Sequence, residues 1–303
     1  RIGVGLGATM LGYSGYLHAL AYARERKQGR PLEGRDPSSP PIAIIEHPDV
    51  RRMLLQQKAY VEGGLALGLW CGLLIDEEKT GESEEARHKA TRLLDIITPV
   101  AKAWPSEFCL EANKLAIQVH GGYGYTRDFP VEHLYRDNRL NPIHEGTQGI
   151  QGLDLLGRKA VVDEGACFVA LTAVVEEMAG DARIAGFTVE ADAVLDAWRD
   201  VAAALQATGA RLGEGHLARA LANATPFLNG FGHIVVTALW LRQAAVAQRA
   251  LEAGAAGDET AFYRGKVQAM RYMVNLELGP ARAWLAATGY GDTTVLDTEP
   301  DWL

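Results

Sequence analysis

A single carboxylate on a glycine-containing turn is the strongest candidate for chemistry in this 303-residue chain. Glu145 lies in the segment IHEGTQGIQ (143–151) and is followed at once by Gly146. Leucines at helical spacing follow between 153 and 156, so we expect a helix to start here. A carboxylate at a helix start lies near unpaired backbone N–H groups and the positive end of the helix dipole. Such a site can hold a base and bind the oxyanion that proton abstraction creates, although many acidic residues at helix starts only stabilise the helix.

A second glycine-rich segment, QVHGGYGYT (118–126), precedes the first. Gln118, Gly121 and Gly122 belong to a turn with little side-chain bulk, so backbone N–H groups can approach a phosphate closely. A tight turn between two helices accounts equally well for a glycine pair. The residues alone leave both interpretations open.

Composition narrows the class of protein. Hydrophobic residues make up 48% of the chain, and the net charge is −8 without long single-sign runs, which argues against a nucleic-acid surface. The three cysteines, Cys71, Cys109 and Cys167, are far apart and form no CxxC pair, which is typical of a reducing, cytoplasmic setting. We identify no apolar run of about 18 residues and expect no membrane span.

No metal site is expected. His120, His133 and His144 are close in sequence but lack the spacing of metal ligands, and Cys109 has no partner nearby.

Helical periodicity dominates the chain, and no β-rich segment is found. In the first half the predicted helices are 1–28, 48–76, 84–103, 105–120, one opened by Pro130 and one begun at Thr147, with a proline-rich loop at 30–46. In the alanine-rich second half they are 167–179, 190–208, 216–252 and 260–287, the third kinked by Pro226 and Gly230. We therefore predict an all-α fold, with a helical domain at 1–160 and an additional four-helix bundle-like domain at 161–303.

The two motifs together resemble the signature of the acyl-CoA dehydrogenase family, whose C-terminal helical domain carries Gln-x-x-Gly-Gly-x-Gly followed by Tyr-Glu-Gly-Thr. The segment ARERK (23–27) resembles the family's Glu-Arg-Lys segment, and Arg1 lies 25 residues before Arg26, where the family also tends to carry an arginine. His144 departs from the pattern, because it stands where the family usually has tyrosine.

The proline-rich loop, the segment HPDVRRMLL (47–55) and the alanine-rich region 161–303 are similar to one branch of the family. That branch includes the 3-methylmercaptopropionyl-CoA dehydrogenases, which have an extra C-terminal helical domain. In the family, a helical domain and a β-domain precede the position of Arg1, and this chain lacks both.

The resemblance implies FAD-dependent α,β-dehydrogenation of an acyl-CoA thioester to the trans-2-enoyl-CoA, with electrons passing to electron-transfer flavoprotein. It implies these roles: Glu145 as base, His144 and Gly146 beside the substrate, and FAD contacts from Arg26, Gln118, Gly121, Gly122, Thr147 and Gln148. The glycine turn would reach FAD bound mainly to a partner subunit, so a homodimer is expected. A short acyl group such as 3-methylmercaptopropionyl is favoured as substrate.

Three alternatives stay open at this point. An acyl-CoA oxidase would share Glu145 and the flavin but react with oxygen. Some relatives bind DNA in the damage response, which needs a basic surface, and the net charge of −8 argues against this alternative. The third alternative is a purely structural helical fragment, catalytically silent without the two preceding domains.

Overall fold

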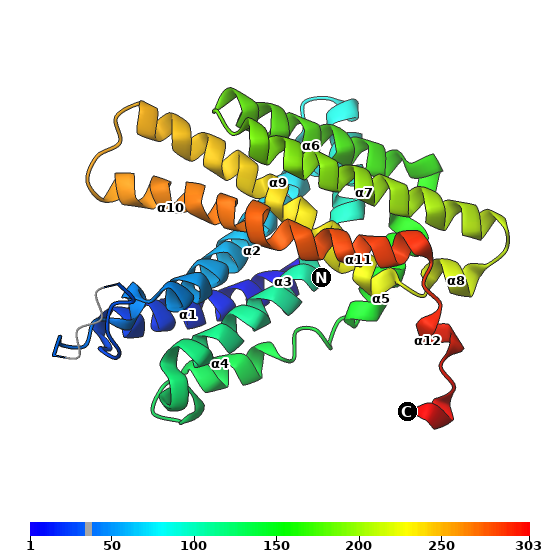
Figure 1. Cartoon of the computed structure of the whole chain (residues 1–303). Helices are drawn as coiled ribbons and strands as arrows, with labels where there is room; N and C mark the ends of the chain where they lie inside the picture. Colours follow the sequence, from blue (N-terminus) through cyan, green and yellow to red (C-terminus); the bar gives the residue numbers. More distant parts are fainter. Residues whose placement is uncertain (34–37) are drawn as a thin grey trace.

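The computed structural model describes residues 1–33 and 38–303. Within these ranges the chain is helical, and the only β-type pairing is one isolated bridge between Lys27 and Ala43. In Figure 1, α1 and α4 lie in the lower part of the molecule and α6 and α7 in the upper part, while α2 and α3 rise from the lower part to a turn behind α6. Helices α10 and α11 cross the middle of the view. The predicted all-α fold class is confirmed.

The first three long helices are α1 (Ile2–Glu25), α2 (Pro48–Thr80) and α3 (Glu84–His120), and all three pack against one another. Glycine makes the contact between α1 and α3 close. A Cβ at Gly5 would lie 1.8 Å from the Ala101 carbonyl oxygen, and one at Gly12 would lie 2.8 Å from Cys109 Cβ. Close packing therefore offsets the low helix propensity of these glycines.

The predicted helix start at Pro105 is wrong. Helix α3 runs without interruption through both Pro99 and Pro105, so the two expected helices are one of 37 residues. Pro105 cannot donate to the carbonyl of Ala101, four residues earlier. That carbonyl instead lies against the bare Cα of Gly5 in α1, so tertiary packing tolerates the lost hydrogen bond.

The proline-rich loop ends in a short 3-10 turn, η1 (Ile44–Glu46), immediately before α2. Helix α2 begins at Pro48 as predicted. The His47 imidazole lies 2.7 Å from the Gln28 carbonyl oxygen and holds the end of the loop against the end of α1. Residues 34–37 of the predicted loop lie outside the described residues.

The remaining elements follow in chain order. They are η2 (Gly121–Tyr125), α4 (Val131–Asn138), α5 (Gln148–Asp154), η3 (Leu155–Lys159), η4 (Val162–Gly165), α6 (Ala166–Ile184), α7 (Thr188–Gly213), α8 (Leu217–Leu221), α9 (Ala224–Glu252), α10 (Asp258–Tyr272), η5 (Met273–Glu277), α11 (Leu278–Tyr290), α12 (Thr294–Asp297) and η6 (Pro300–Trp302).

The predicted kink at Pro226 and Gly230 is also wrong. The break falls earlier, at Ala222 and Asn223, and separates α8 from α9. Pro226 lies in the first turn of α9, where its missing N–H costs little. Gly230 is inside α9, and a Cβ there would lie 2.8 Å from the Ala281 carbonyl oxygen. This glycine therefore allows close packing of α11 on α9.

One hydrophobic core runs through both halves of the chain. Trp240 of α9 donates to the Ala59 carbonyl of α2 at 3.0 Å, and Trp104 of α3 donates to His233 Nδ1 at 3.0 Å. His233 Nε2 in turn lies 3.0 Å from Glu277. Because Trp104 occupies Nδ1 as an acceptor, Nε2 carries the proton and donates to the Glu277 carboxylate.

Two helical segments are apolar enough to meet a length and hydropathy test for membrane spans, contrary to the expectation from sequence. Their 18-residue windows, in α2 and in Leu217–Glu252, have mean hydropathy of 1.3 and 1.2. The windows are 56% and 83% buried within the bundle. This burial is typical of core helices, which pass the same test.

Candidate functional site

Glu145 lies on a tight turn between α4 and α5. Its φ is 57° and that of Gly146 is 97°, so two successive residues have left-handed backbone. Such a conformation is costly for a residue with a side chain and is enriched at functional sites. Helix α5 begins at Gln148 with Thr147 as its N-cap, so Glu145 stands two residues before the cap and not within the first turn. The exposed Glu145 carboxylate forms no hydrogen bond or ion pair with any described residue.

Gln151 supports this turn from inside the protein. The buried Gln151 amide lies 3.3 Å from the carbonyl oxygen of Glu145 and 3.5 Å from that of Gly146. A Cβ on Gly146 would lie 2.4 Å from Gln151 Nε2. Position 146 therefore requires glycine, both because of its φ and because Gln151 leaves no room for a Cβ. Gln151 is a residue to which the sequence assigned no role.

A chain of side-chain amides connects the turn to the core. His144 Nε2 lies 3.0 Å from Asn141 Oδ1, and Asn141 donates to Asn138 Oδ1 at 2.8 Å. Asn138 donates to Asn113 Oδ1 at 2.7 Å, and Asn113 donates to the Leu11 carbonyl at 2.9 Å. All three asparagines are buried. Because Asn141 Oδ1 can only accept, His144 carries its proton on Nε2 and leaves Nδ1 as an acceptor.

Lys102 places a buried cation beneath the same loop. Its side chain is fully buried and donates to the Asn141 carbonyl at 2.7 Å. Burial lowers the pKa of Lys102, the nearby positive charge of Arg1 lowers it further, and the Glu145 carboxylate acts in the opposite direction. Arg1 itself pairs with Asp154 of α5 at 2.7 Å. The only signal in the sequence is a lysine inside an apolar stretch, and our sequence analysis missed it.

Thr147 and Gln148 line a separate hollow of about 570 Å³. Arg139 lines it as well. The Gln148 amide nitrogen lies 3.3 Å from both the Ala103 carbonyl oxygen and Asn229 Oδ1. Its buried Oε1 accepts no hydrogen bond from any residue that the structure describes. The side chain of Gln148 therefore bridges α3 and α9, and that of Thr147 stays exposed.

The other four candidates meet at the end of α3. Arg26, Gln118, Gly121 and Gly122 line one hollow of about 610 Å³. The Arg26 guanidinium lies 5.5 Å from the centre of the Tyr123 ring, and its buried Nε has no hydrogen-bond partner among residues 1–33 and 38–303. Gly121 has φ 62°, and a Cβ there would meet open space. This unsatisfied cation beside an open glycine turn is suited to an anion such as a pyrophosphate.

The two groups of candidates lie on different parts of α3. The Glu145 loop contacts this helix at Lys102 and Ala103, whereas the glycine turn follows Gln118. Fifteen residues at about 1.5 Å per residue separate them by about 22 Å along the helix axis. The structure therefore does not bring all of the predicted site residues into one cavity.

His120 lies apart from the Glu145 loop, at the end of α3. His120 stacks on Tyr22 and contacts Phe129 edge-on, and its Nδ1 lies 2.8 Å from the Ala116 carbonyl oxygen. In residues 1–33 and 38–303, no group of three or more histidine, cysteine or acidic side chains is arranged to hold a metal ion.

Two family models match nearly the whole chain. Residues 1–160 match the model described as "Acyl-CoA dehydrogenase, C-terminal domain", and residues 170–299 match "Acetyl-CoA dehydrogenase C-terminal like".

Curated relatives agree with these matches. The chain is 43% identical to 3-methylmercaptopropionyl-CoA dehydrogenase of Ruegeria pomeroyi over 165 residues, 54% of this chain and 28% of that protein. It is 35% identical over 275 residues to the broad-specificity linear acyl-CoA dehydrogenase FadE5 of Mycobacterium tuberculosis, 88% of this chain and 45% of that protein. The chain therefore spans less than half the length of these two relatives.

Solved structures show the same fold. An acyl-CoA dehydrogenase from Bacillus anthracis, solved with FAD, superposes with a TM-score of 0.67 at 19% identity. The match covers all of this chain and 49% of that one.

Proposed function

Because this chain belongs to the acyl-CoA dehydrogenase family, we propose that the protein that carries it dehydrogenates an acyl-CoA thioester. In this reaction Glu145 takes the α-proton, and the β-hydrogen leaves as hydride. The product is the trans-2-enoyl-CoA. The observation that supports this role most directly is the unpartnered carboxylate of Glu145 on a strained and well-supported turn.

The surroundings of Glu145 suit a base that must act on a weak carbon acid. The backbone N–H groups of Glu145 and Gly146 donate no hydrogen bond to any described residue. Fixed donors of this kind stabilise the negative charge that develops on a thioester oxygen during proton abstraction. Gln151 holds the turn through two carbonyl contacts, so little reorganisation is needed at the moment of reaction.

The residues present fit FAD, which when bound would accept the hydride. Arg26 offers a guanidinium with a buried, unpaired Nε, and Gly121 and Gly122 leave the backbone accessible beside it. These groups would hold the pyrophosphate. Thr147 is exposed and available for a contact near the base, whereas the Gln148 side chain would have to leave Ala103 and Asn229 to make one.

For the substrate we propose a short acyl group, with 3-methylmercaptopropionyl-CoA as the first candidate. His144 presents Nδ1 as an acceptor, which makes the wall beside Glu145 more polar than a tyrosine ring would. Values of kcat/KM that rise steadily from butanoyl-CoA to palmitoyl-CoA would contradict this choice. For the electron acceptor, we propose electron-transfer flavoprotein on the ground of family membership.

The test of the function is anaerobic flavin reduction in the intact holoprotein. We expect the yellow flavin to bleach when 3-methylmercaptopropionyl-CoA or butanoyl-CoA is added, and to recover its colour with electron-transfer flavoprotein. Rapid recovery with oxygen alone would identify an oxidase. A flavin that no acyl-CoA of any chain length bleaches would contradict the proposed dehydrogenation.

A further inference from the structure

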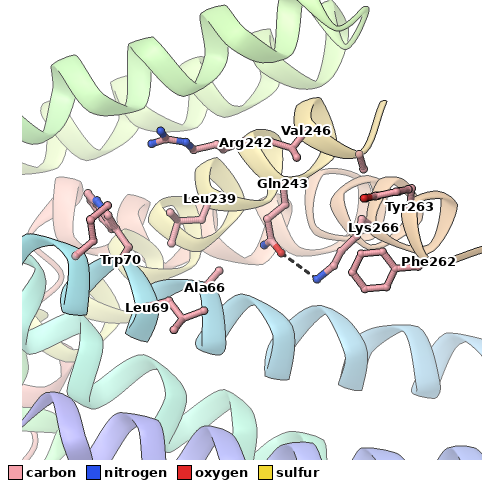
Figure 2. A pocket seen from close by; sticks show the side chains of 12 residues that line it. Ala66, Leu69, Trp70, Leu239, Arg242, Gln243, Val246, Phe262, Tyr263 and Lys266 are labelled. Carbon is pink, nitrogen blue, oxygen red and sulfur yellow. Dashed lines mark hydrogen bonds between the residues drawn. The ribbon is translucent and has the colours of Figure 1, made fainter. Parts of the chain in front are cut away.

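A hollow of about 460 Å³ opens between α2, α9 and α10, away from both groups of candidate residues (Figure 2). Its apolar lining includes Leu69 and Trp70 of α2, Leu239 of α9 and Phe262 of α10. Leu69 and Phe262 are 66% and 54% exposed. Large apolar side chains that gather around a concave surface mark a ligand or partner site more often than isolated exposed ones do. The volume is within the range of small-molecule sites.

One end of this hollow contains a hydrogen-bond donor without an acceptor. Gln243 lines the hollow, and its Oε1 accepts a hydrogen bond from Lys266 Nζ at 3.1 Å (Figure 2). This contact fixes the orientation of the amide, so Nε2 is turned away from Lys266. Nε2 is buried and has no hydrogen-bond partner in the described part of the chain. Because a buried N–H that is left unpaired is costly, a ligand oxygen at this position would remove an existing penalty.

The charges around the hollow favour an anion. The Glu62 carboxylate is shared by Lys58 and Lys266, so these three residues carry one net positive charge. Lys266 also lies 5.2 Å from the ring centre of Trp240 and 5.3 Å from that of Phe262. Arg242, on another side of the hollow, has no hydrogen bond or ion pair with the described residues.

We propose that this hollow binds a single-chain aliphatic carboxylate. One carboxylate oxygen accepts from Gln243 Nε2, Arg242 and Lys266 supply positive charge around the hollow, and the alkyl chain lies against Leu69, Trp70 and Leu239. An apolar surface with one unmet donor and an excess of positive charge matches a molecule with one anionic end and one apolar end. The site is separate from Glu145 and does not depend on the proposed dehydrogenation.

The test is calorimetric binding of decanoate to the 303-residue chain, below the concentration at which decanoate forms micelles. We expect saturable binding of one decanoate, with decanol binding more weakly because it lacks the charge. Gln243→Leu removes the donor and should weaken decanoate binding by about tenfold or more, since hydrogen bonds to charged groups are the stronger kind. No saturable binding, or equal affinity of wild type and Gln243→Leu, would overturn the proposal.

A matched pair of variants controls for general stickiness. Leu69 and Val169 are both 66% exposed, but Val169 lies on α6 outside the hollow. Both positions should tolerate a polar side chain without loss of the fold. Leu69→Glu should abolish decanoate binding by placing a carboxylate in the wall, and Val169→Glu should leave it unchanged. Equal losses in the two variants would contradict a defined site, and a hollow that only another protein or a second copy occupies would show no decanoate binding.

Discussion

The backbone at Glu145 and Gly146 is strained, and buried polar groups hold it in place. Gln151 contacts both carbonyl oxygens of the turn, and the amide chain from His144 to Asn113 anchors the residues before it. Neutral side-chain amides make most of these contacts. The Glu145 carboxylate therefore keeps no partner among the described residues, whereas the backbone that positions it is held in place by hydrogen bonds.

The turn makes a prediction about Gly146. Gly146→Ala should destabilise the protein by about 1–3 kcal/mol, because alanine is strained at φ 97° and its Cβ would meet Gln151 Nε2. Chemical denaturation with urea measures the change. Gly180→Ala on α6 is the control: a Cβ there meets nothing within 4 Å, and alanine favours the helix by about 1 kcal/mol. Equal effects at the two glycines would show that the turn is not constrained.

Lys102 makes a prediction about pH. Its pKa in the folded protein is lowered, chiefly by burial, so the unfolded chain holds this proton more tightly than the folded one. The free energy of unfolding should therefore rise as the pH increases from neutral through the lowered pKa towards 10.5. Lys102→Met has no titrating group at this position, so the free energy of unfolding of the wild type should increase relative to that of the variant between pH 7 and pH 10. Parallel urea-unfolding profiles would contradict a perturbed Lys102.

At the scale of elements, most helices could be predicted because their apolar periodicity is strong. The positions at which helices break or continue through proline could not be predicted. Pro105 continues a helix because the orphaned carbonyl of Ala101 lies against Gly5, a residue of another helix. Pro226 does not kink its helix because α9 begins only two residues earlier. Both outcomes depend on neighbours that the local sequence does not contain.

The candidate site could be predicted in part, namely its motif residues but not the residues that support them. The two motifs identified Glu145 and the glycine turn, but Lys102, Asn141 and Gln151 carry no motif of their own. Lys102 acts through a tertiary contact with the Asn141 carbonyl oxygen, whereas Gln151 acts within its own segment by folding back on the Glu145 carbonyl oxygen. Gln148 shows the reverse case, since its motif position suggested a cofactor contact and its amide is used between α3 and α9.

The π-helical turn η5 makes a prediction about the contact between elements. It ends at Glu277, whose carboxylate accepts from Tyr60 of α2 and His233 of α9. Burial acts to raise the pKa of Glu277, but the hydrogen bonds from His233 and Tyr60 outweigh it and the pKa is lowered. Glu277→Gln should therefore cost about 1–3 kcal/mol at pH 7, because an amide has only one acceptor oxygen and its NH2 group would face a buried donor.

The cost of Glu277→Gln should also depend on pH. A lowered carboxyl pKa adds stability above the ordinary value of 4.5, and this stability is lost as the pH falls through the folded-state pKa. The difference between wild type and Glu277→Gln should therefore narrow as the pH falls below 4.5. Exposed Glu259, which forms no ion pair with the described residues, serves as the control through Glu259→Gln. A difference that stays constant from pH 7 to pH 3.5 would contradict an ionised Glu277.

At the scale of the whole molecule, the Glu145 loop and the glycine turn lie about 22 Å apart along α3. We propose that the glycine turn of one chain contacts FAD whose reactive end serves another chain, so that the active protein is a homodimer. Light scattering on the intact protein should give two chains, and Arg26→Ala should lower the flavin content without dissociating them. A monomer that is active and loaded with FAD would contradict the shared site.

The most direct test of the catalytic role is the rate of anaerobic flavin reduction in Glu145→Gln of the intact holoprotein. The amide keeps the shape of the side chain but cannot accept the α-proton, so we expect the rate to fall by several orders of magnitude, at least about a thousandfold. FAD content and acyl-CoA affinity should stay close to those of wild type. Flavin bleaching by Glu145→Gln within tenfold of the wild-type rate would show that another group is the base.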